Sequence, residues 1–486
     1  MKVSILIGLV AVLACQMPAG AQRTPDFPPD SVTARMDYEN MLEQLGISLP
    51  ALPSVDDDPR RPAHIHPARK GERNAWLWWS DADYMPGDTL RYQVTRSPFG
   101  LWMNYYDTPD LEGAYRPIDP LGDVPGGPVD TPEAWRERAR PVWMELCREC
   151  IWGHAPAVAD SLRVEWTCAE VKWGGKDTPY RKYTLDGWVD TSAYPALKHS
   201  PCISGILYLP KDARDVPLII QFAWFNAPMP TVYLDECMKR GWGLLQMDCR
   251  RLQPDDGAAL TDYLTGLCNH GRWRRPTDWG TLAAWAWGAS RLVDYFEQDP
   301  RVDARRIGIT GHSRYGKAAL AAMALDERLA VAYLSCSGMG GTSPMRRHYG
   351  EDFESLGWER LHHWLAGNAL RWCGELVPGR YLPRRVATLP VDAQVMLALC
   401  APRPVFIGTG ESDTWSDPLG SYLTGLRTSP VYELLGVPGL DNEDDPHPQP
   451  DKAYSRGRLA YRMHRGDHTD VPDWPAFAVW AEKFLQ

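Results

Sequence analysis

The chain has 486 residues, of which 44% are hydrophobic, and its formal net charge is −10. This length suits one large α/β domain or two to three smaller domains. Because acidic residues are in excess and no block of Lys or Arg occurs, nucleic acid and anionic membrane surfaces are poor candidate partners.

The first 21 residues have the features of a secretory signal peptide. Lys2 is followed by an apolar stretch, residues 3–14, and residues 19–21 form an Ala-Gly-Ala cleavage site. The apolar stretch is too short to span a bilayer, and no other stretch is long enough. We expect an exported protein, periplasmic or extracellular, with lipid attachment at Cys15 as the less favoured alternative.

Cleavage after Ala21 leaves ten cysteines, from Cys147 to Cys400. Cys147 and Cys150 form a C-x-x-C pair in a helix-like stretch, but no second pair lies at zinc spacing. We expect mostly buried thiols with a disulfide or two, and no metal site.

Residues 22–130 form an N-terminal extension that is rich in Pro, Gly and Asp. Within it, Leu90, Tyr92 and Val94 alternate with polar residues, which predicts a strand in a small β-rich patch. Most of the 22 Trp in the chain are expected to pack in the interior. An alternative is that the Trp of this extension form a platform for glycan binding.

From residue 131 to residue 486 the pattern is that of a single α/β domain. Residues 133–153 read as a helix, and residues 278–300 as a helix with Asp278 as its N-cap and Pro300 after its end. Another helix is expected from Gly316. Strands are expected in the runs SGILYLP, VPLIIQFAWF, GWGLLQMDCR, RIGIT, LAVAYLSC, RPVFIGTG and RLAYRMH. Strands that alternate with helices predict a mostly parallel sheet with helices on both faces.

Three polar residues follow late strands in an informative order. Ser313 lies between a strand and a helix, Asp413 follows the strand RPVFIGTG, and His468 follows RLAYRMH. Because the carboxyl ends of parallel strands form one edge of a sheet, these side chains are expected to meet there. Ser, then an acid, then His is the chain order of an α/β-hydrolase triad, in which His takes the Ser proton and a carboxylate orients His.

The motif around Ser313 also resembles a known family. GHSRYGK, residues 311–317, is similar to the G-x-S-R-x-G-K signature of the glucuronoyl esterases, carbohydrate esterase family 15, and looks closest to their bacterial branch. Further similar stretches are WGTLAAWAWGASRL, SGMGG, RRHYGE, LPVDAQVMLALCAPRPV, DTWSDPLG, SPVYELLG and the final G-x-H. The resemblance covers about residues 130–486, and it implies the α/β-hydrolase fold.

The resemblance also implies roles for particular residues. Ser313 would be the nucleophile, His468 the base, and Arg314 would stabilise the oxyanion through its N–H and its guanidinium. A second backbone donor is expected near Ala223 and Trp224. The positions that match sugar-contacting residues of the family are Lys317, Glu351 and Trp415; ordinary surface or packing roles are the alternative for each.

The acid departs from part of the family. Some members carry a Glu just before S-G-x-G-G, where this chain has Cys336. A thiol is no permanent anionic partner for His, so we expect Asp413 to be the acid, with Glu411, expected to lie deeper, as its rival. Asp417 is expected in a loop or cap, and Asp467 as a solvated neighbour of His468.

The resemblance implies a secreted serine esterase that cleaves esters of (4-O-methyl-)glucuronic acid, as in lignin–carbohydrate links to glucuronoxylan. It implies no cofactor and no metal, and we expect a monomer without a membrane span. Another polysaccharide esterase, acting on acetyl or methyl esters, is one alternative. A non-catalytic glycan-binding protein with a hydrolase-like body is another.

Overall fold

The computed structural model describes most of the chain after residue 114, together with one helix and four strands before it. The expected signal peptide and most of the N-terminal extension lie outside the described residues. Those described are 27–29, 31–47, the strands 65–66, 76–78, 92–96 and 102–106, and 115–486 without 173–177, 226–227, 348, 352, 374, 378–379, 383–384 and 443–444.

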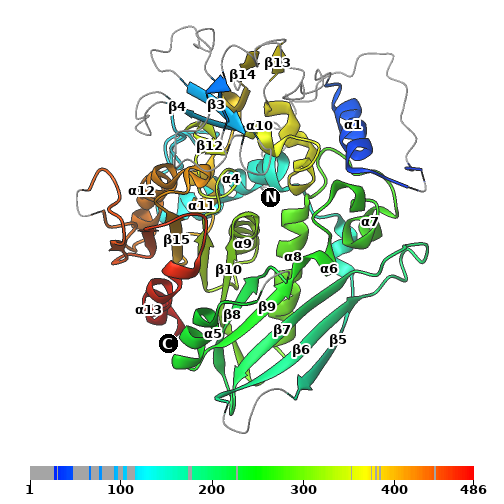
Figure 1. Ribbon diagram of the computed structural model, residues 1–486, viewed down its shortest axis with the longest axis vertical. Coiled ribbons are helices and arrows are strands. Elements are labelled where there is room, and N and C mark those ends of the chain that lie inside the picture. The colour runs from blue at the N-terminus through cyan, green and yellow to red at the C-terminus, as the bar shows by residue number, and fades with distance from the viewer. Residues whose placement is uncertain are drawn as a thin grey trace, which may run out of the picture.

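A ten-stranded sheet forms the centre of the molecule (Figure 1). Its order is β16-β17-β15-β11-β10-β8-β9-β7-β6-β5, and β8, β9, β10, β11, β15 and β17 run parallel to one another, whereas β5–β7 and β16 are antiparallel to their neighbours. The bounds are β5 Val164–Val171, β6 Tyr180–Val189, β7 Cys202–Pro210, β8 Val216–Phe222, β9 Gly243–Asp248, β10 Val302–His312, β11 Val331–Ser335, β15 Val405–Gly410, β16 Ala453–Tyr454 and β17 Leu459–His464. The expected parallel core is confirmed, with antiparallel strands added at its edges.

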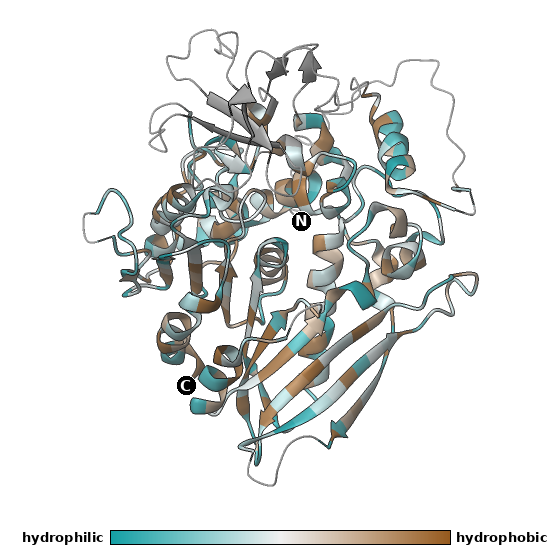
Figure 2. Ribbon diagram, in the orientation of Figure 1, coloured by the Kyte–Doolittle hydropathy of each residue, from teal (hydrophilic) through white to brown (hydrophobic). Residues whose placement is uncertain are grey.

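Helices cover both faces of the sheet, as expected for buried parallel strands. One face packs against α5 (Thr231–Lys239) and α13 (Trp474–Leu485), through Tyr233, Trp474 and Phe477. The other face packs against α8 (Thr281–Phe296), α9 (Arg314–Leu325) and the large apolar cluster around them. Figure 2 shows apolar colour along the central strands and mixed colour on β5 and β6, because β5 has no buried residue and β6 buries few.

The remaining helical segments surround this core. An interrupted helical stretch runs from Pro132 to Trp152, as the sequence predicted, in four pieces: α3 Pro132–Ala134, η2 Trp135–Ala139, α4 Arg140–Cys147 and η3 Arg148–Trp152. The others are η4 Ala157–Ser161, α6 Cys249–Leu252, η5 Gly257–Ala259, α7 Tyr263–Asn269, η6 Met345–Arg347, α10 Phe353–Leu356, η7 His362–Trp364, η8 Gly367–Trp372, η9 Arg385–Thr388, α11 Ala393–Ala398, η10 Thr414–Ser416, α12 Pro418–Leu434 and η11 Val471–Asp473.

Two helix starts differ from the sequence prediction. Gly280, not Asp278, is the N-cap residue of α8; the Asp278 carboxylate instead accepts a hydrogen bond from the Arg275 N–H at 2.7 Å. Because an Asp can satisfy a neighbouring turn as well as a helix end, its position alone does not settle the boundary. α9 begins at Arg314, two residues before Gly316.

The N-terminal extension contacts the α/β domain through α1 and through a shared sheet, and also through residues 115–120. α1 (Ala34–Leu45) buries Met41 and Leu45, and Asp37 Oδ2 lies 2.7 Å from His362 Nε2 with both side chains buried. A second sheet, in the order β1-β2-β3-β4-β12, combines four strands of the extension with β12 (Gly350–Glu351) of the domain. Its other strands are β1 Ile65–His66, β2 Trp76–Trp78, β3 Tyr92–Arg96 and β4 Trp102–Tyr106, and a separate hairpin pairs β13 Glu375–Val377 with β14 Arg380–Leu382.

The cysteines and helices add two further observations. All ten cysteines from Cys147 to Cys400 are free thiols in the structure, and Cys168 is the exposed one. The expected disulfide or two is therefore not formed among them. Within the described ranges, no helix combines the length and the apolar character that crossing a bilayer requires.

Candidate active site

Ser313 stands at the sharp turn between β10 and α9. Its backbone has φ 58° and ψ −127°, a strained conformation for a residue with a side chain. The Ser313 N–H donates to the Ser335 carbonyl of the neighbouring strand β11 at 2.9 Å, which fixes the turn to the sheet. The geometry is that of a nucleophile elbow, which presents a hydroxyl above the carboxyl ends of the strands.

The two glycines of the elbow are required by close backbone approaches. A Cβ on Gly311 would lie 2.2 Å from the Tyr315 carbonyl oxygen, and one on Gly316 would lie 3.0 Å from the Ser335 carbonyl oxygen. Tyr315 instead points into the interior, where its ring lies 4.6 Å from that of Trp224 and 5.2 Å from that of Trp285. The glycine after Ser313 is therefore needed at position 316, and position 315 is free to carry a large side chain.

Asp413 and His468 lie together at the same edge of the sheet. His468 Nδ1 is 2.7 Å from Asp413 Oδ2, and the His468 ring centroid is 4.4 Å from that of His312, the residue before Ser313. Asp413 follows β15 and is 2% exposed, whereas the His468 side chain, after β17, is 28% exposed. The structure thus gathers the three predicted residues from the ends of β10, β15 and β17.

The pairing of Asp413 with His468 perturbs both groups. Burial by itself would raise the pKa of Asp413, but the hydrogen bond and charge of His468 outweigh it and lower that pKa. Burial would likewise lower the pKa of His468, but the hydrogen bond and charge of Asp413 raise it above the usual histidine value. The pair therefore favours an ionised carboxylate beside a His that retains its Nδ1 proton.

The other acidic residues near His468 have different surroundings. Glu411 is exposed, so the expectation that it lies deeper than Asp413 is wrong; its N–H bonds the His464 carbonyl. The chain turns outward directly after β15 at that point. Asp417 caps α12 through the Gly420 N–H and pairs with Arg347 at 2.8 Å, and Asp467 is exposed. Each of these two residues has the role that the sequence predicted.

Arg314 is held by a cluster that the sequence did not predict. Its guanidinium donates to Asp255 Oδ2 at 2.6 Å, and it lies between two indole rings, 5.2 Å from Trp224 and 4.8 Å from Trp364. His363 Nε2 and Trp364 Nε1 both bond the other oxygen, Asp255 Oδ1, at 3.0 and 2.5 Å. All donors of this cluster converge on one carboxylate, which orients the guanidinium beside Ser313.

The charge of Asp255 is stabilised by these contacts. Burial alone would raise the pKa of Asp255, but hydrogen bonding and charge from His363, followed by the charge of Arg314, hold it below its usual range. Asp255 is therefore a fixed anion, and the Arg314 side chain, 32% exposed, is a fixed cation.

Backbone donors are also available near Ser313. Among the described residues, the Arg314 N–H at the start of α9 and the Trp224 N–H after β8 have no hydrogen-bond acceptor, whereas the Ala223 N–H donates to the Met247 carbonyl at 3.1 Å. Trp224 is thus the better placed of the two residues expected to supply a second donor. Two free N–H groups beside a strained Ser are suited to a developing oxyanion.

Lys317 and Glu351 form a buried ion pair next to the elbow. Lys317 Nζ donates to Glu351 Oε2 at 2.6 Å and to the carbonyls of Ser337 and Met339 at 2.7 and 2.6 Å, and both side chains are 3% exposed. Burial lowers the pKa of Lys317 and raises that of Glu351, and each partner's charge opposes this. Because its three donors already have acceptors, Lys317 holds the Glu351 carboxylate in place.

The glycine-rich turn before this pair explains part of SGMGG. Gly338 has φ 58°, and a Cβ there would lie 2.5 Å from Glu351 Oε2. A side chain at this position would therefore separate the carboxylate from Lys317.

Trp415 lies beside Glu351 through a second glycine contact. Gly350 has φ 74°, and a Cβ there would lie 2.3 Å from the Thr414 carbonyl oxygen and 2.6 Å from that of Trp415. β12 therefore packs directly on η10, which places half-buried Trp415 next to the strand that carries Glu351. The three residues expected to contact a sugar thus lie close to one another.

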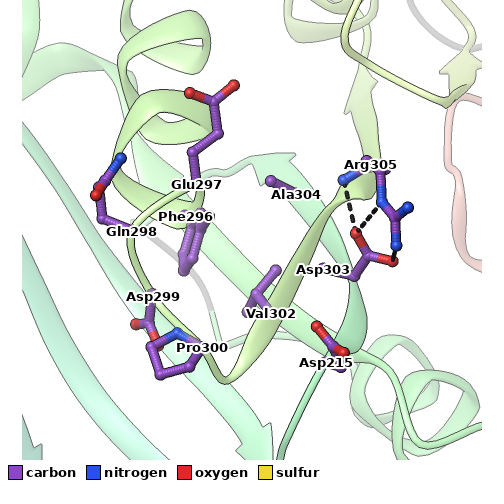
Figure 3. Close-up of a pocket in the computed structure, with 10 residues that line it drawn as sticks. All are labelled: Asp215, Phe296, Glu297, Gln298, Asp299, Pro300, Val302, Asp303, Ala304 and Arg305. Atoms are coloured by element: carbon purple, nitrogen blue, oxygen red, sulfur yellow. Dashed lines mark hydrogen bonds and ion pairs between the residues drawn. The ribbon is translucent and has the colours of Figure 1, made fainter.

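A surface hollow at the opposite end of β10 is a separate feature. Figure 3 shows Asp215, Asp299, Asp303 and Arg305 among its lining residues, where α8 ends and β10 begins. Asp303 already binds Arg305 at 3.1 Å, and Asp299 binds Arg301 at 2.6 Å. These carboxylates stabilise loops at the amino end of the sheet, far along β10 from Ser313.

Sequence reasoning did not identify Asp255, His363, Trp364 and Ser416. Ser416 lies within DTWSDPLG, and its Oγ is 3.3 Å from His468 Nδ1 and donates to the Cys336 carbonyl at 3.1 Å. Its position three residues after Asp413 could have indicated that it lies near the proposed acid. Asp255 and the His363-Trp364 pair lie in segments without periodicity, more than 100 residues apart, so nothing local connects them.

Three comparisons bear on identity. A family model described as glucuronyl esterase of fungi matches residues 272–436. A protein named as a carbohydrate esterase, from an unknown prokaryote, is 35% identical over 412 residues, which is 76% of this chain and 89% of the relative. A 4-O-methyl-glucuronoyl methylesterase of Schizophyllum commune is 31% identical over 341 residues, 68% of this chain and 77% of the relative.

Solved structures agree with these relatives. A glucuronoyl esterase of carbohydrate esterase family 15 from Teredinibacter turnerae has a TM-score of 0.71 and 29% identity, covering 93% of this chain and 99% of that one. A glucuronoyl esterase from Solibacter usitatus has a TM-score of 0.64 and 26% identity, covering 77% and 100%. The architecture described above is the α/β-hydrolase fold, as predicted.

Proposed function

Because this chain belongs to the glucuronoyl esterases of carbohydrate esterase family 15, which are carboxylic ester hydrolases, we propose that it cleaves esters of glucuronic acid through an acyl-enzyme on Ser313. The observation that carries the proposal is the 2.7 Å hydrogen bond between His468 Nδ1 and Asp413, with the His468 ring next to the strained elbow. This arrangement leaves His468 Nε2 to accept the Ser313 proton.

The reaction follows from these positions. His468 takes the Ser313 proton as Oγ attacks the uronate carbonyl carbon, and the negative charge on the carbonyl oxygen meets the Arg314 guanidinium and the N–H groups of Arg314 and Trp224. His468⁺ then gives its proton to the departing alcohol. A water molecule, deprotonated by His468, attacks the acyl-enzyme and releases the free acid. Asp413 keeps His468 in the required tautomer throughout.

The substrate class rests on the sugar side of the site and on the relatives. Glu351, held by Lys317, and the indole of Trp415 suit a hydroxyl-rich ring whose C–H face is apolar. The Schizophyllum commune relative is named for 4-O-methyl-glucuronoyl methyl esters. We propose 4-O-methyl-glucuronate esters of glucuronoxylan, as in lignin–carbohydrate links, hydrolysed outside the cytoplasm by a monomer.

Two measurements test the proposal. The kcat/KM for benzyl glucuronate should greatly exceed that for 4-nitrophenyl acetate, and Ser313→Ala should abolish turnover of both while sugar binding remains. A higher kcat/KM for the acetate would indicate a general polysaccharide esterase. Turnover by Ser313→Ala near the wild-type rate would show that the elbow assignment is wrong.

A split in kinetic constants tests the sugar side. Glu351→Gln should raise KM for benzyl glucuronate strongly and leave the acetate ester nearly unaffected, since the acetate has no hydroxyls to bind. Equal losses on both esters would mean that the pair supports only the elbow.

A further inference from the structure

Cys336 places a thiol beside His468, the proposed base, and beside Asp413, the carboxylate that orients it. It follows β11 and is 1% exposed. One donor atom from each of Cys336, Asp413 and His468 lies within 4.8 Å of the other two. Sulfur, carboxylate oxygen and imidazole nitrogen are together the donor set that Zn²⁺ and Cd²⁺ prefer.

We propose that Cys336, Asp413 and His468 form an inhibitory binding site for a thiophilic divalent cation, with Zn²⁺ and Cd²⁺ as the fitting ions. The ion at this site would not be a cofactor. It would inhibit the enzyme, because it competes with the hydrogen bond between His468 and Asp413 that the esterase reaction uses. The inference rests on the proposed function only for its inhibitory consequence, and not for binding itself.

The distances are close to those of a three-ligand site. Zinc–sulfur and zinc–nitrogen bonds of about 2.3 and 2.0 Å put tetrahedral ligand atoms about 3.5 Å apart. In the structure, the three ligand atoms lie within 4.8 Å of one another, and His468 Nδ1 is 2.7 Å from Asp413 Oδ2. These two distances lie on either side of the spacing that zinc requires. Side-chain rotations that move each ligand atom by less than about an ångström would therefore bring all three into bonding distance of one ion. Ser416 Oγ, 3.3 Å from His468 Nδ1, lies beside the same atoms.

Binding would change protonation in a defined way. The Cys336 thiol loses its proton to solvent as sulfur bonds the cation, because the thiolate is the ligand form. The cation takes the place of the proton on His468 Nδ1, and that proton moves to Nε2. With Nε2 protonated, His468 has no lone pair for the Ser313 proton, so acylation stops. Removal of the ion by a chelator restores both protons and the activity.

The charges around the site are compatible with a cation. The nearby lysine and arginine are already paired, Lys317 with Glu351 at 2.6 Å and Arg314 with Asp255 at 2.6 Å. Asp413 is thus the uncompensated charge when His468 is neutral. One dication with the Asp413 carboxylate and a Cys336 thiolate forms a neutral group, which is the arrangement that a buried site requires.

The test compares three proteins with ZnCl₂ and with CdCl₂. Wild-type hydrolysis should be inhibited reversibly, with one ion bound per chain by equilibrium dialysis. Cys336→Ala should need at least about tenfold more of either ion for the same fractional inhibition, since one of three ligands is lost. Inhibition is expressed relative to each protein's own uninhibited rate. Cys168→Ala, which removes the exposed thiol, should behave as wild type.

A second variant keeps the test decisive if Cys336→Ala folds poorly. Cys336→Ser retains the size of the side chain but offers a hard oxygen, so it should lose Cd²⁺ sensitivity more than Zn²⁺ sensitivity. Equal sensitivity of wild type and both Cys336 variants would overturn the proposal. Because dialysis needs no turnover, absent binding refutes this site alone, whereas an active Ser313→Ala refutes the proposed mechanism alone.

Discussion

At the scale of single residues, two carboxylates each orient one functional side chain of the site. Asp413 accepts a hydrogen bond from His468, and Asp255 accepts hydrogen bonds from Arg314, His363 and Trp364. Asp413 could be inferred from its place after a strand. Asp255 could not, because its partners come from distant segments and no local pattern marks it.

Asp413→Asn should reduce kcat/KM for a glucuronate ester by roughly 10²–10⁴. The amide keeps the shape but removes the counter-charge of the imidazolium and can stabilise the wrong tautomer. Glu411→Gln is the matched control, and it should stay near the wild-type rate because Glu411 is exposed. If Glu411→Gln is the more damaged variant, the acid has been misassigned.

The same pair sets the acidic limb of the pH profile. Only neutral His468 accepts the Ser313 proton, and Asp413 raises the pKa of His468 above the histidine value, usually about 6.5. Wild-type kcat/KM should therefore fall as the pH drops through the raised pKa of His468, which lies above the usual histidine pKa. In Asp413→Asn the raising influence is lost, so the limb should shift to lower pH. A limb at the same pH in both proteins would contradict the pairing.

Asp255 is a positioning residue with a kinetic signature. Asp255→Asn should lower kcat about tenfold to a hundredfold with little change in KM, because the Arg314 guanidinium loses its fixed place near the oxyanion. Asp294→Asn, which weakens the surface pair with Arg328, is the control and should leave both constants unchanged. A change confined to KM would assign Asp255 to substrate binding instead.

At the scale of elements, the strand ends and the turns that follow them determine the site. The sequence predicted the parallel strands well, because buried strands are continuous apolar runs that end where polar residues begin. It located helix ends less well. Asp278 is not the N-cap of α8, and α9 begins two residues before the predicted start. Several polar residues near a helix boundary can each satisfy the backbone, so the sequence does not single out one of them.

Tyr315 provides a test of the elbow as a packed element. Tyr315→Gly should lower the free energy of unfolding by about 3–5 kcal/mol, as expected for removal of a large buried aromatic side chain. Urea denaturation measures this loss. Val479→Ala is a control on an exposed apolar residue and should change stability by less than about 0.5 kcal/mol. Unchanged stability in Tyr315→Gly would mean that the ring is not part of the core.

At the scale of the whole molecule, the N-terminal extension is joined to the site's surroundings. α1 reaches His362 through Asp37, and β4 pairs with β12, the strand of Glu351. The sequence predicted a β-rich patch in the extension, but neither contact could be foreseen. Both join residues more than 200 positions apart, and only the folded domain brings them together.

The tether of α1 should contribute to stability rather than to catalysis. Asp37→Ala leaves the buried His362 Nε2 without its acceptor, which should cost about 1–3 kcal/mol and lower the melting temperature, with kcat preserved. Glu39→Ala removes an exposed pair with Arg35 on the same helix and should cost less than about 1 kcal/mol. Equal effects of the two changes would mean that α1 is not anchored at His362.

The displaced glycine of the elbow has a consequence for recognising serine hydrolases by pattern. The requirement at this turn is space at two backbone positions, and here Gly311 and Gly316 supply it, two residues before and three after the Ser. A search that demands glycine two residues after the Ser would pass over this chain. Writing the rule as forbidden Cβ positions, and not as letters at fixed intervals, would retain it and still reject a Gly-His-Ser in an ordinary loop.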